Sequence, residues 1–118
     1  MADAPVTIFH NPNCGTSRNV LAALTEAGVG PKVVEYLKVG WTAPQLKGLL
    51  AAMKATPRDI LRVRGTPAEE LGLTKPAASD AAILAAMVAH PILVERPIVV
   101  TPKGTALCRP ADKVKSLL

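Results

Sequence analysis

Aromatic residues are scarce in this 118-residue chain, which holds one Trp, one Tyr and one Phe. Hydrophobic residues still make up 49% of it, so we expect an aliphatic, alanine-rich core and no disorder. No apolar run approaches the roughly 20 residues of a membrane span, and residues 1–5 lack the basic and apolar regions of a signal peptide. These absences predict one cytoplasmic domain over residues 1–118, with no membrane partner.

Cysteine is also scarce. Cys14 and Cys108 lie far apart in the sequence, and a structural disulfide is a poor expectation in a reducing compartment. Two Cys and two His at these spacings do not form a zinc ligand set, so we expect no metal. The net charge of +5 could suggest nucleic acid, but the basic residues are scattered and no aromatic residues lie between them to stack bases. We therefore expect no nucleic acid partner.

The polar segment 10–18, His-Asn-Pro-Asn-Cys-Gly-Thr-Ser-Arg, joins a strand-like run to a periodic segment typical of a helix. Cys14 is thus predicted at or just before a helix start, where free N–H groups and the helix dipole favour a thiolate. Arg18, one turn on, adds a positive charge, and the same N–H groups can hold an oxyanion. The alternative is a small buried cysteine that packs as a hydrophobic residue. The polar neighbours favour a reactive thiol.

Apolar patterns along the chain predict an α/β fold. Strands are expected at 6–9, 33–36, 98–101 and 105–108, with helices at 16–27 and from Pro110 to the end. The first strand, helix and second strand form a parallel βαβ unit, and the last two strands form a hairpin. This element order is that of a thioredoxin-like fold, a four-stranded mixed sheet with helices on both faces.

Residues 42–90 show only helical signals and predict an all-helical insertion between the second and third strands. Thr42 begins a capping box, and Thr-Pro pairs predict short helices at 56–61 and 66–72. The last helix is expected to start near Ser79. We interpret this segment as an insertion within one domain.

Several motifs together closely resemble the glutaredoxin-linked arsenate reductases over nearly the whole chain. They are segment 10–18, Glu-Leu-Gly-Leu at 70–73, His-Pro-Ile-Leu at 90–93, Arg-Pro-Ile-Val-Val at 96–100, and Gly104 through Leu-Cys-Arg-Pro at 107–110. The resemblance implies a nucleophilic Cys14, an oxyanion held by Arg62, Arg96 and Arg109, and a thiol activated by His10, Ser17 and Arg18.

The resemblance also implies an activity. Members of this family reduce arsenate to arsenite through a covalent thiol-arsenate adduct, with glutathione as co-substrate and glutaredoxin as partner. No bound cofactor is implied. Some related proteins have lost part of the arginine set and act in other thiol chemistry, so a thiol oxidoreductase or redox regulator without arsenate activity is the alternative function.

The chemistry gives an independent reason for arginine. A thiolate and an oxyanion about 4 Å apart repel by roughly 4 kcal/mol at an effective dielectric of 20, and a guanidinium fork can grip two oxyanion oxygens at once. The alternative for each arginine is an ion pair with a neighbour such as Glu95. Because Pro97 can occupy only the start of a strand, we expect a cis Arg96–Pro97 bond that turns Arg96 toward Cys14.

Other functions and roles stay open. A cysteine phosphatase would need Arg six positions after Cys14, where Val20 stands, and a disulfide-switch regulator would need a second Cys at Ser17. His10 could raise the thiolate fraction through a positive charge or through an ordered hydrogen bond. Cys108 could resolve a disulfide with Cys14, but a buried hydrophobic role is favoured because the family draws its resolving thiol from glutathione.

Overall fold

The computed structural model describes residues 6–118, which fall into two compact units. The first unit comprises the residues up to Val39 together with Arg96–Leu118, and the second is Gly40–Glu95. Residues 1–5, for which the sequence predicts no signal peptide, lie outside the described residues. Within residues 6–118, no helix has the length and apolar character needed to cross a membrane.

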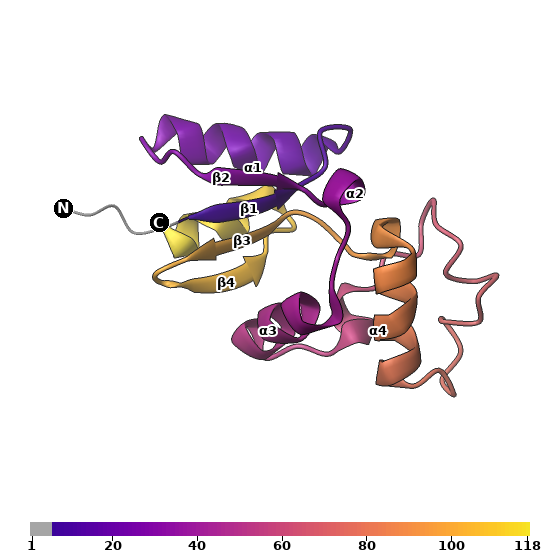
Figure 1. Cartoon of the computed structure of the whole chain (residues 1–118). Helices are drawn as coiled ribbons and strands as arrows, with labels where there is room; N and C mark the ends of the chain where they lie inside the picture. Colours follow the sequence, from indigo (N-terminus) through magenta and orange to yellow (C-terminus); the bar gives the residue numbers. More distant parts are fainter. Residues whose placement is uncertain (1–5) are drawn as a thin grey trace. The chain divides into compact units, whose positions relative to one another are not determined.

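A four-stranded mixed sheet forms the scaffold of the first unit (Figure 1). Its strands are β1 (Thr7–His10), β2 (Lys32–Glu35), β3 (Ile98–Thr101) and β4 (Gly104–Leu107), in the order β2-β1-β3-β4. Strand β2 pairs with β1 in parallel, and β3 is antiparallel to both β1 and β4. The predicted mixed sheet is confirmed, and each strand lies within one position of its expected range.

Two helical segments share one face of this sheet. They are α1 (Gly15–Glu26) and the 3-10 helix η3 (Ala111–Leu117), which replaces the predicted C-terminal α-helix. Their buried side chains join those of the sheet in one apolar cluster of Ile8, Val20, Leu24, Val99, Cys108, Val114 and Leu117. The predicted cover of helices on the opposite face stays a prediction.

The second unit is helical, as the sequence predicts for residues 42–90. It contains α3 (Ala43–Met53), the 3-10 helix η1 (Pro57–Ile60), α4 (Asp80–Ala89) and the 3-10 helix η2 (Pro91–Leu93). The capping box at Thr42 is present, and the Ser79 hydroxyl caps α4. One short helix, α2 (Tyr36–Val39), directly follows β2 in the first unit and was not expected.

The predicted helix at 66–72 is wrong, because the chain forms a series of turns there. The Thr66 hydroxyl donates to the carbonyls of Arg62 and Val63, at 2.7 and 2.9 Å, which holds the start of the segment in a turn. Gly65 and Gly72 both adopt a positive φ, of 74°, and this left-handed backbone interrupts a helix on either side. A single turn of hydrogen bonds is too short to propagate a helix between them.

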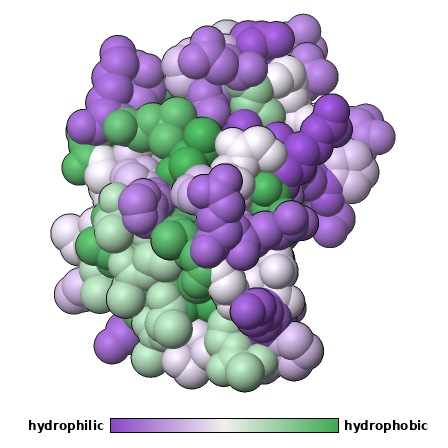
Figure 2. All heavy atoms as spheres, turned by 90° about the vertical axis from the view of Figure 1, so that its right-hand side faces the viewer, coloured by the Kyte–Doolittle hydropathy of each residue, from purple (hydrophilic) through white to green (hydrophobic). Residues whose placement is uncertain are grey.

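The surface of the second unit is mixed in character. Its exposed large apolar side chains are those of Val63, Leu71 and Val88. On the face of the molecule shown in Figure 2, hydrophobic side chains gather between hydrophilic ones. Val88, on α4, therefore faces solvent, whereas the neighbouring Met87 is fully buried in the core.

Candidate active site

Cys14 occupies the N-cap position of α1, with an extended backbone at φ −99° and ψ 122°. Its N–H donates to the Asn11 carbonyl at 3.0 Å, and its own carbonyl accepts from the Arg18 N–H, also at 3.0 Å. The Asn11 side-chain oxygen accepts from the Asn13 N–H at 2.9 Å, which is the turn that the Asn-Pro-Asn sequence favours. The loop thus presents the Cys14 sulfur to the free N–H groups that begin the helix.

Cys14 is more buried than its polar neighbours suggest. The residue is only 9% exposed, while Pro12, Asn13 and Gly15 around it are exposed. The thiol therefore lies beneath a polar loop. A nucleophile in this position is shielded from bulk water, which strengthens its interactions with nearby charges.

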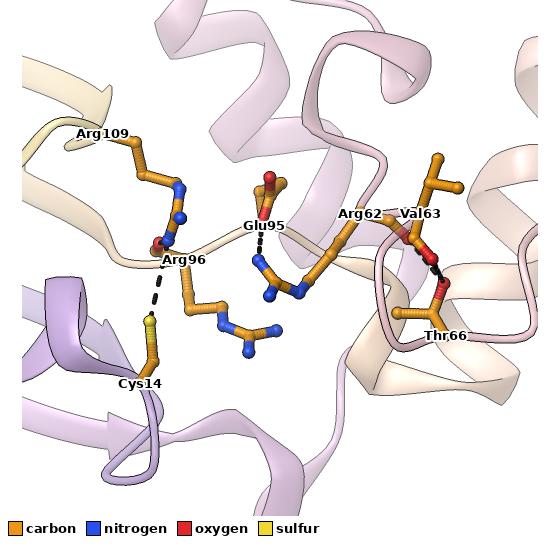
Figure 3. A network of polar contacts seen from close by, with 7 residues as sticks. All are labelled: Cys14, Arg62, Val63, Thr66, Glu95, Arg96 and Arg109. Carbon is orange, nitrogen blue, oxygen red and sulfur yellow. Dashed lines mark hydrogen bonds and ion pairs between the residues drawn. The ribbon is translucent and has the colours of Figure 1, made fainter.

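Arg96 and Arg109 both act on this sulfur. The Arg109 Nη1 lies 3.6 Å from the Cys14 Sγ and donates to the Arg96 carbonyl at 2.9 Å (Figure 3). The predicted cis Arg96–Pro97 bond is confirmed, and a second cis bond, Arg109–Pro110, was not predicted. Both arginines come from the ends of sheet strands, since Arg96 shortly precedes β3 and Arg109 shortly follows β4.

The pKa of the Cys14 thiol is lowered. Burial is the largest single influence and by itself raises the pKa, but hydrogen bonds from the Ser17 backbone N–H and from the side chains of Arg96 and Arg109 together outweigh it. Helix N–H groups and two guanidinium groups thus stabilise the thiolate, the form that acts as a nucleophile.

Arg96 is a buried charge with unused donors. The residue is 8% exposed, and its buried Nε and Nη1 atoms have no hydrogen-bond partner in the described part of the chain. A buried N–H without an acceptor costs about 1–3 kcal/mol, and more when the group is charged. An anion that reached these two nitrogens would supply the missing acceptors. Arg96 therefore has the character of an anion-binding group with free donors beside a thiolate.

His10 and Ser17 form a buried pair next to the loop. The His10 Nδ1 lies 2.6 Å from the Ser17 hydroxyl oxygen, which also accepts from the Asn11 N–H at 3.1 Å. Burial lowers the pKa of His10; Glu35 opposes this shift and Arg18 adds to it. Of the two predicted roles, the geometry supports an ordered hydrogen bond. A neutral His10 can accept a hydrogen bond from the Ser17 hydroxyl. This orients the hydroxyl oxygen that accepts from the loop N–H of Asn11.

Arg18 is placed differently from the expectation. Its Nη1 donates to the Pro12 carbonyl at 2.9 Å, so the guanidinium closes the loop from the solvent side. The groups that lower the pKa of Cys14 are the Ser17 N–H, Arg96 and Arg109. Arg18 thus holds the shape of the thiol loop, residues 10–18. The sequence suggested instead that its charge acts directly on the sulfur.

Arg62 belongs to the second unit and is held by a carboxylate. Its Nη1 lies 2.8 Å from the Glu95 Oε1 (Figure 3), and both side chains are partly exposed, at 18% and 24%. A short antiparallel pairing of Leu61 with Val94 places Arg62 and Glu95 on the same side of the two segments. The structure thus shows the ion pair that the sequence offers as the alternative role for Arg62.

Cys108 lacks the features of a reactive thiol. It is fully buried in the apolar cluster, and burial raises its pKa to about 11, with a small opposing influence from Lys113. A thiol of this pKa is almost entirely protonated at neutral pH. This favours the buried hydrophobic role over that of a resolving cysteine.

Two side chains near the sulfur, those of Asn11 and Tyr36, were not identified from the sequence as parts of the site. Tyr36 follows β2, is fully buried, and interacts through its hydroxyl with the side chains of Asn11 and Arg96. The available signal was position, because Tyr36 and the Cys14 loop follow the carboxyl ends of adjacent parallel strands. Among residues 6–118, no group of three His, Cys, Asp or Glu side chains could hold a metal ion.

Comparisons with known proteins agree with one another. The ArsC family model matches residues 9–117. The arsenate reductase ArsI1 of Synechocystis sp. is 56% identical over 118 residues, which are all of this chain and 82% of that protein. The arsenate reductase of Escherichia coli K12 is 45% identical over 113 residues, 96% of this chain and 80% of that protein.

Solved structures show the same likeness. The arsenate reductase of Vibrio cholerae superimposes with a TM-score of 0.93 and 36% identity, over 99% of this chain and 100% of that one. The fold and the sequence therefore lead to the same conclusion, and the chain belongs to the ArsC family.

Proposed function

We propose that this protein is a cytoplasmic arsenate reductase that works as a single domain over residues 1–118. The two relatives named above are arsenate reductases that are 56% and 45% identical to this chain, which supports the same reaction class here. One observation carries the proposal. A thiol of lowered pKa lies beside a buried Arg96 whose Nε and Nη1 have no acceptor among residues 6–118.

The first step is attack by the Cys14 thiolate on arsenic. The incoming oxyanion and the thiolate repel each other by roughly 4 kcal/mol at 4 Å and an effective dielectric of 20. Arg96 and Arg109 can cancel this repulsion, because both already lie beside the sulfur and neither can lose its charge. The sulfur–arsenic bond forms as one arsenic–oxygen bond breaks, and that oxygen leaves as water after taking up protons.

The other site residues have supporting roles in this proposal. Ser17 contributes its backbone N–H to the sulfur and its hydroxyl to the loop, and His10 orients that hydroxyl. Arg18 fixes the loop through the Pro12 carbonyl. For Arg62, an oxyanion-binding role rests on the family resemblance alone.

Reduction of arsenic from the +5 to the +3 state needs two electrons. In the proposed cycle two external thiols supply them. Glutathione attacks the arsenic of the adduct and a second arsenic–oxygen bond breaks, with that oxygen leaving as water. Glutaredoxin then attacks the glutathione sulfur, the bond between that sulfur and arsenic breaks with its electron pair left on arsenic, and a mixed disulfide of glutaredoxin and glutathione forms. Hydrolysis of the remaining sulfur–arsenic bond releases arsenite and restores the Cys14 thiolate. The inert character of Cys108 supports an external second thiol. No bound metal or flavin takes part. Arsenate, glutathione and glutaredoxin are thus the proposed partners.

The test is an arsenate-reduction assay coupled to glutathione and glutaredoxin, with C14S as the control. We expect arsenite to form with the wild-type protein and not with C14S. Phosphate should compete with arsenate for the anion site but should not be reduced. If the wild-type protein gives no arsenite while Cys14 still exchanges with glutathione, the thiol oxidoreductase without arsenate activity is the correct function.

A further inference from the structure

Tyr36 lies at the same sheet edge as the reactive thiol. It directly follows β2, and the parallel register of His10 with Glu35 places Tyr36 level with Asn11, the first residue after β1. Tyr36 is the only tyrosine of the chain, and its side chain is fully buried. A buried phenol hydroxyl normally requires hydrogen-bond partners, so its surroundings show what it does.

The side chains of Asn11 and Arg96 lie close enough to the Tyr36 hydroxyl to lower its pKa, and Cys14 acts on that pKa in the opposite direction. Burial is the main influence on the pKa of Tyr36 and raises it, so the hydroxyl keeps its proton at neutral pH. A neutral phenol oxygen can accept a hydrogen bond from a guanidinium N–H without cancelling its charge.

Asn11, which lies near the Tyr36 hydroxyl, is held in place by three hydrogen bonds. Its N–H donates to the Ser17 hydroxyl, its carbonyl accepts from the Cys14 N–H, and its side-chain oxygen accepts from the Asn13 N–H. Every one of these bonds lies within the thiol loop. The Asn11 side chain also lowers the pKa of Tyr36, and the strand register places the two residues level, so the phenol lies next to the loop that carries the sulfur.

Arg96 is the group that gains from this arrangement. Its guanidinium lies close enough to the Cys14 sulfur and to the Tyr36 hydroxyl to lower the pKa of each, while its buried Nε and Nη1 have no hydrogen-bond partner among residues 6–118. A carboxylate in the place of Tyr36 would also hold Arg96, but it would neutralise the charge that an oxyanion and a thiolate need. A tyrosine holds the guanidinium and leaves its charge intact.

We propose that Tyr36 is a positioning residue. Its hydroxyl, which Asn11 holds in place, keeps the Arg96 guanidinium beside the Cys14 sulfur. Two N–H donors of Arg96 are then left for the oxyanion. This inference rests on the proposed function for the identity of the anion. The positioning of Arg96 on the thiol does not depend on it, and the two can be tested separately.

The test compares Y36F with T101V. Y36F removes only the hydroxyl, whereas T101V deletes a buried hydroxyl that donates to the Leu117 carbonyl at 3.0 Å, at the opposite end of β3. We expect Y36F to slow Cys14 alkylation by iodoacetamide at pH 6 about tenfold, and to raise the half-saturating arsenate concentration by a similar factor. The loss of one hydrogen bond to a charged group has an effect of about this magnitude. T101V should lower the melting temperature but leave the alkylation rate and the half-saturating arsenate concentration unchanged.

A spectroscopic measurement on the folded wild-type protein covers the case in which Y36F does not fold. With tyrosine labelled at the ring carbon that bears the hydroxyl, the single Tyr36 signal should shift when Cys14 is alkylated or sulfate is added, and R96A should abolish the sulfate effect. A Tyr36 signal insensitive to both treatments, or a Y36F protein with wild-type alkylation, would overturn the proposal. Loss of arsenate reduction in wild type with these responses intact would instead refute the proposed function alone.

Discussion

The Nη1 of Arg109 lies 3.6 Å from the sulfur of Cys14, although 95 positions separate the two residues. The sheet brings them together. Strands β1 and β4 are each antiparallel to β3, so they run in the same direction and end at the same edge. Cys14 shortly follows the end of β1 and Arg109 the end of β4, which makes their meeting a consequence of topology.

The substitution R109K tests what this geometry does. Arg109 uses Nη1 both toward the sulfur and toward the Arg96 carbonyl, at 2.9 Å, and a lysine keeps the charge but lacks the planar fork. We expect kcat/KM for arsenate to fall about 10–100-fold, the effect of losing a charged hydrogen bond of roughly 1.5–3 kcal/mol. The coupled assay measures it. Full activity in R109K would mean that positive charge alone suffices.

The two cysteines should differ sharply in reactivity. The pKa of Cys14 is lowered by the Ser17 N–H and two arginines against the effect of burial, whereas burial raises that of Cys108 to about 11. In the native protein at pH 6, iodoacetamide should label Cys14 and leave Cys108 unmodified. Peptide mass spectrometry after brief labelling measures the ratio. Equal labelling of the two thiols would contradict the assignment of Cys14 as the nucleophile.

Cys108 should also make stability fall in alkaline solution. A thiol in the unfolded chain ionises near pH 8.5, but in the folded protein only near 11, so between these values the unfolded state holds fewer protons and is favoured as pH rises. The stability that a buried neutral Cys108 contributes is complete below about pH 8 and should shrink by roughly 2.5 kcal/mol by pH 10.5.

Urea unfolding of wild type and C108A from pH 7 to 10.5 measures this contribution. Both proteins retain Cys14 and Tyr36, so their titration cancels in the difference. The wild-type advantage over C108A should decline with pH. Two parallel stability curves would show that Cys108 ionises in the folded protein as readily as in the unfolded chain.

The parts of the site that depend on local pattern could be predicted from the sequence. The turn signals of segment 10–18 and the helix start after Cys14 fixed the thiol, and Pro97 at a strand start led to the cis bond. The details that could not be predicted depend on long-range packing. Whether Arg18 faces the sulfur or the Pro12 carbonyl, and whether Tyr36 meets Arg96, follows from how separate strands align. No short-range pattern encodes that alignment.

Anion binding should stabilise the protein through Arg96. Because its buried Nε and Nη1 find no acceptor in the described part of the chain, an oxyanion that binds only the folded state should raise the melting temperature. Millimolar sulfate or phosphate should produce this rise in wild type, and R96A should abolish it while remaining folded. R58A is the matched control, since Arg58 donates to the carbonyls of Leu73, Lys75 and Ala78. R58A should melt lower yet keep the anion effect, and a normal gain in R96A would remove Arg96 from the site.

Arg62 has two candidate roles, in the ion pair and in oxyanion binding, and E95Q separates them. Its ion pair with Glu95, at 2.8 Å, is a structural contact that a bound oxyanion would have to share or displace. If Arg62 binds the oxyanion, Glu95 competes for the same guanidinium, and E95Q should lower the half-saturating arsenate concentration several-fold. A partly exposed pair of this kind contributes only about 1 kcal/mol, so E95Q should remain folded.

If Arg62 serves only the ion pair, E95Q should lower the melting temperature slightly and leave the half-saturating arsenate concentration unchanged. R62K, which retains a charge for Glu95 but loses the bidentate fork, should then be nearly as active as wild type, whereas an oxyanion-binding Arg62 requires a clear loss of activity.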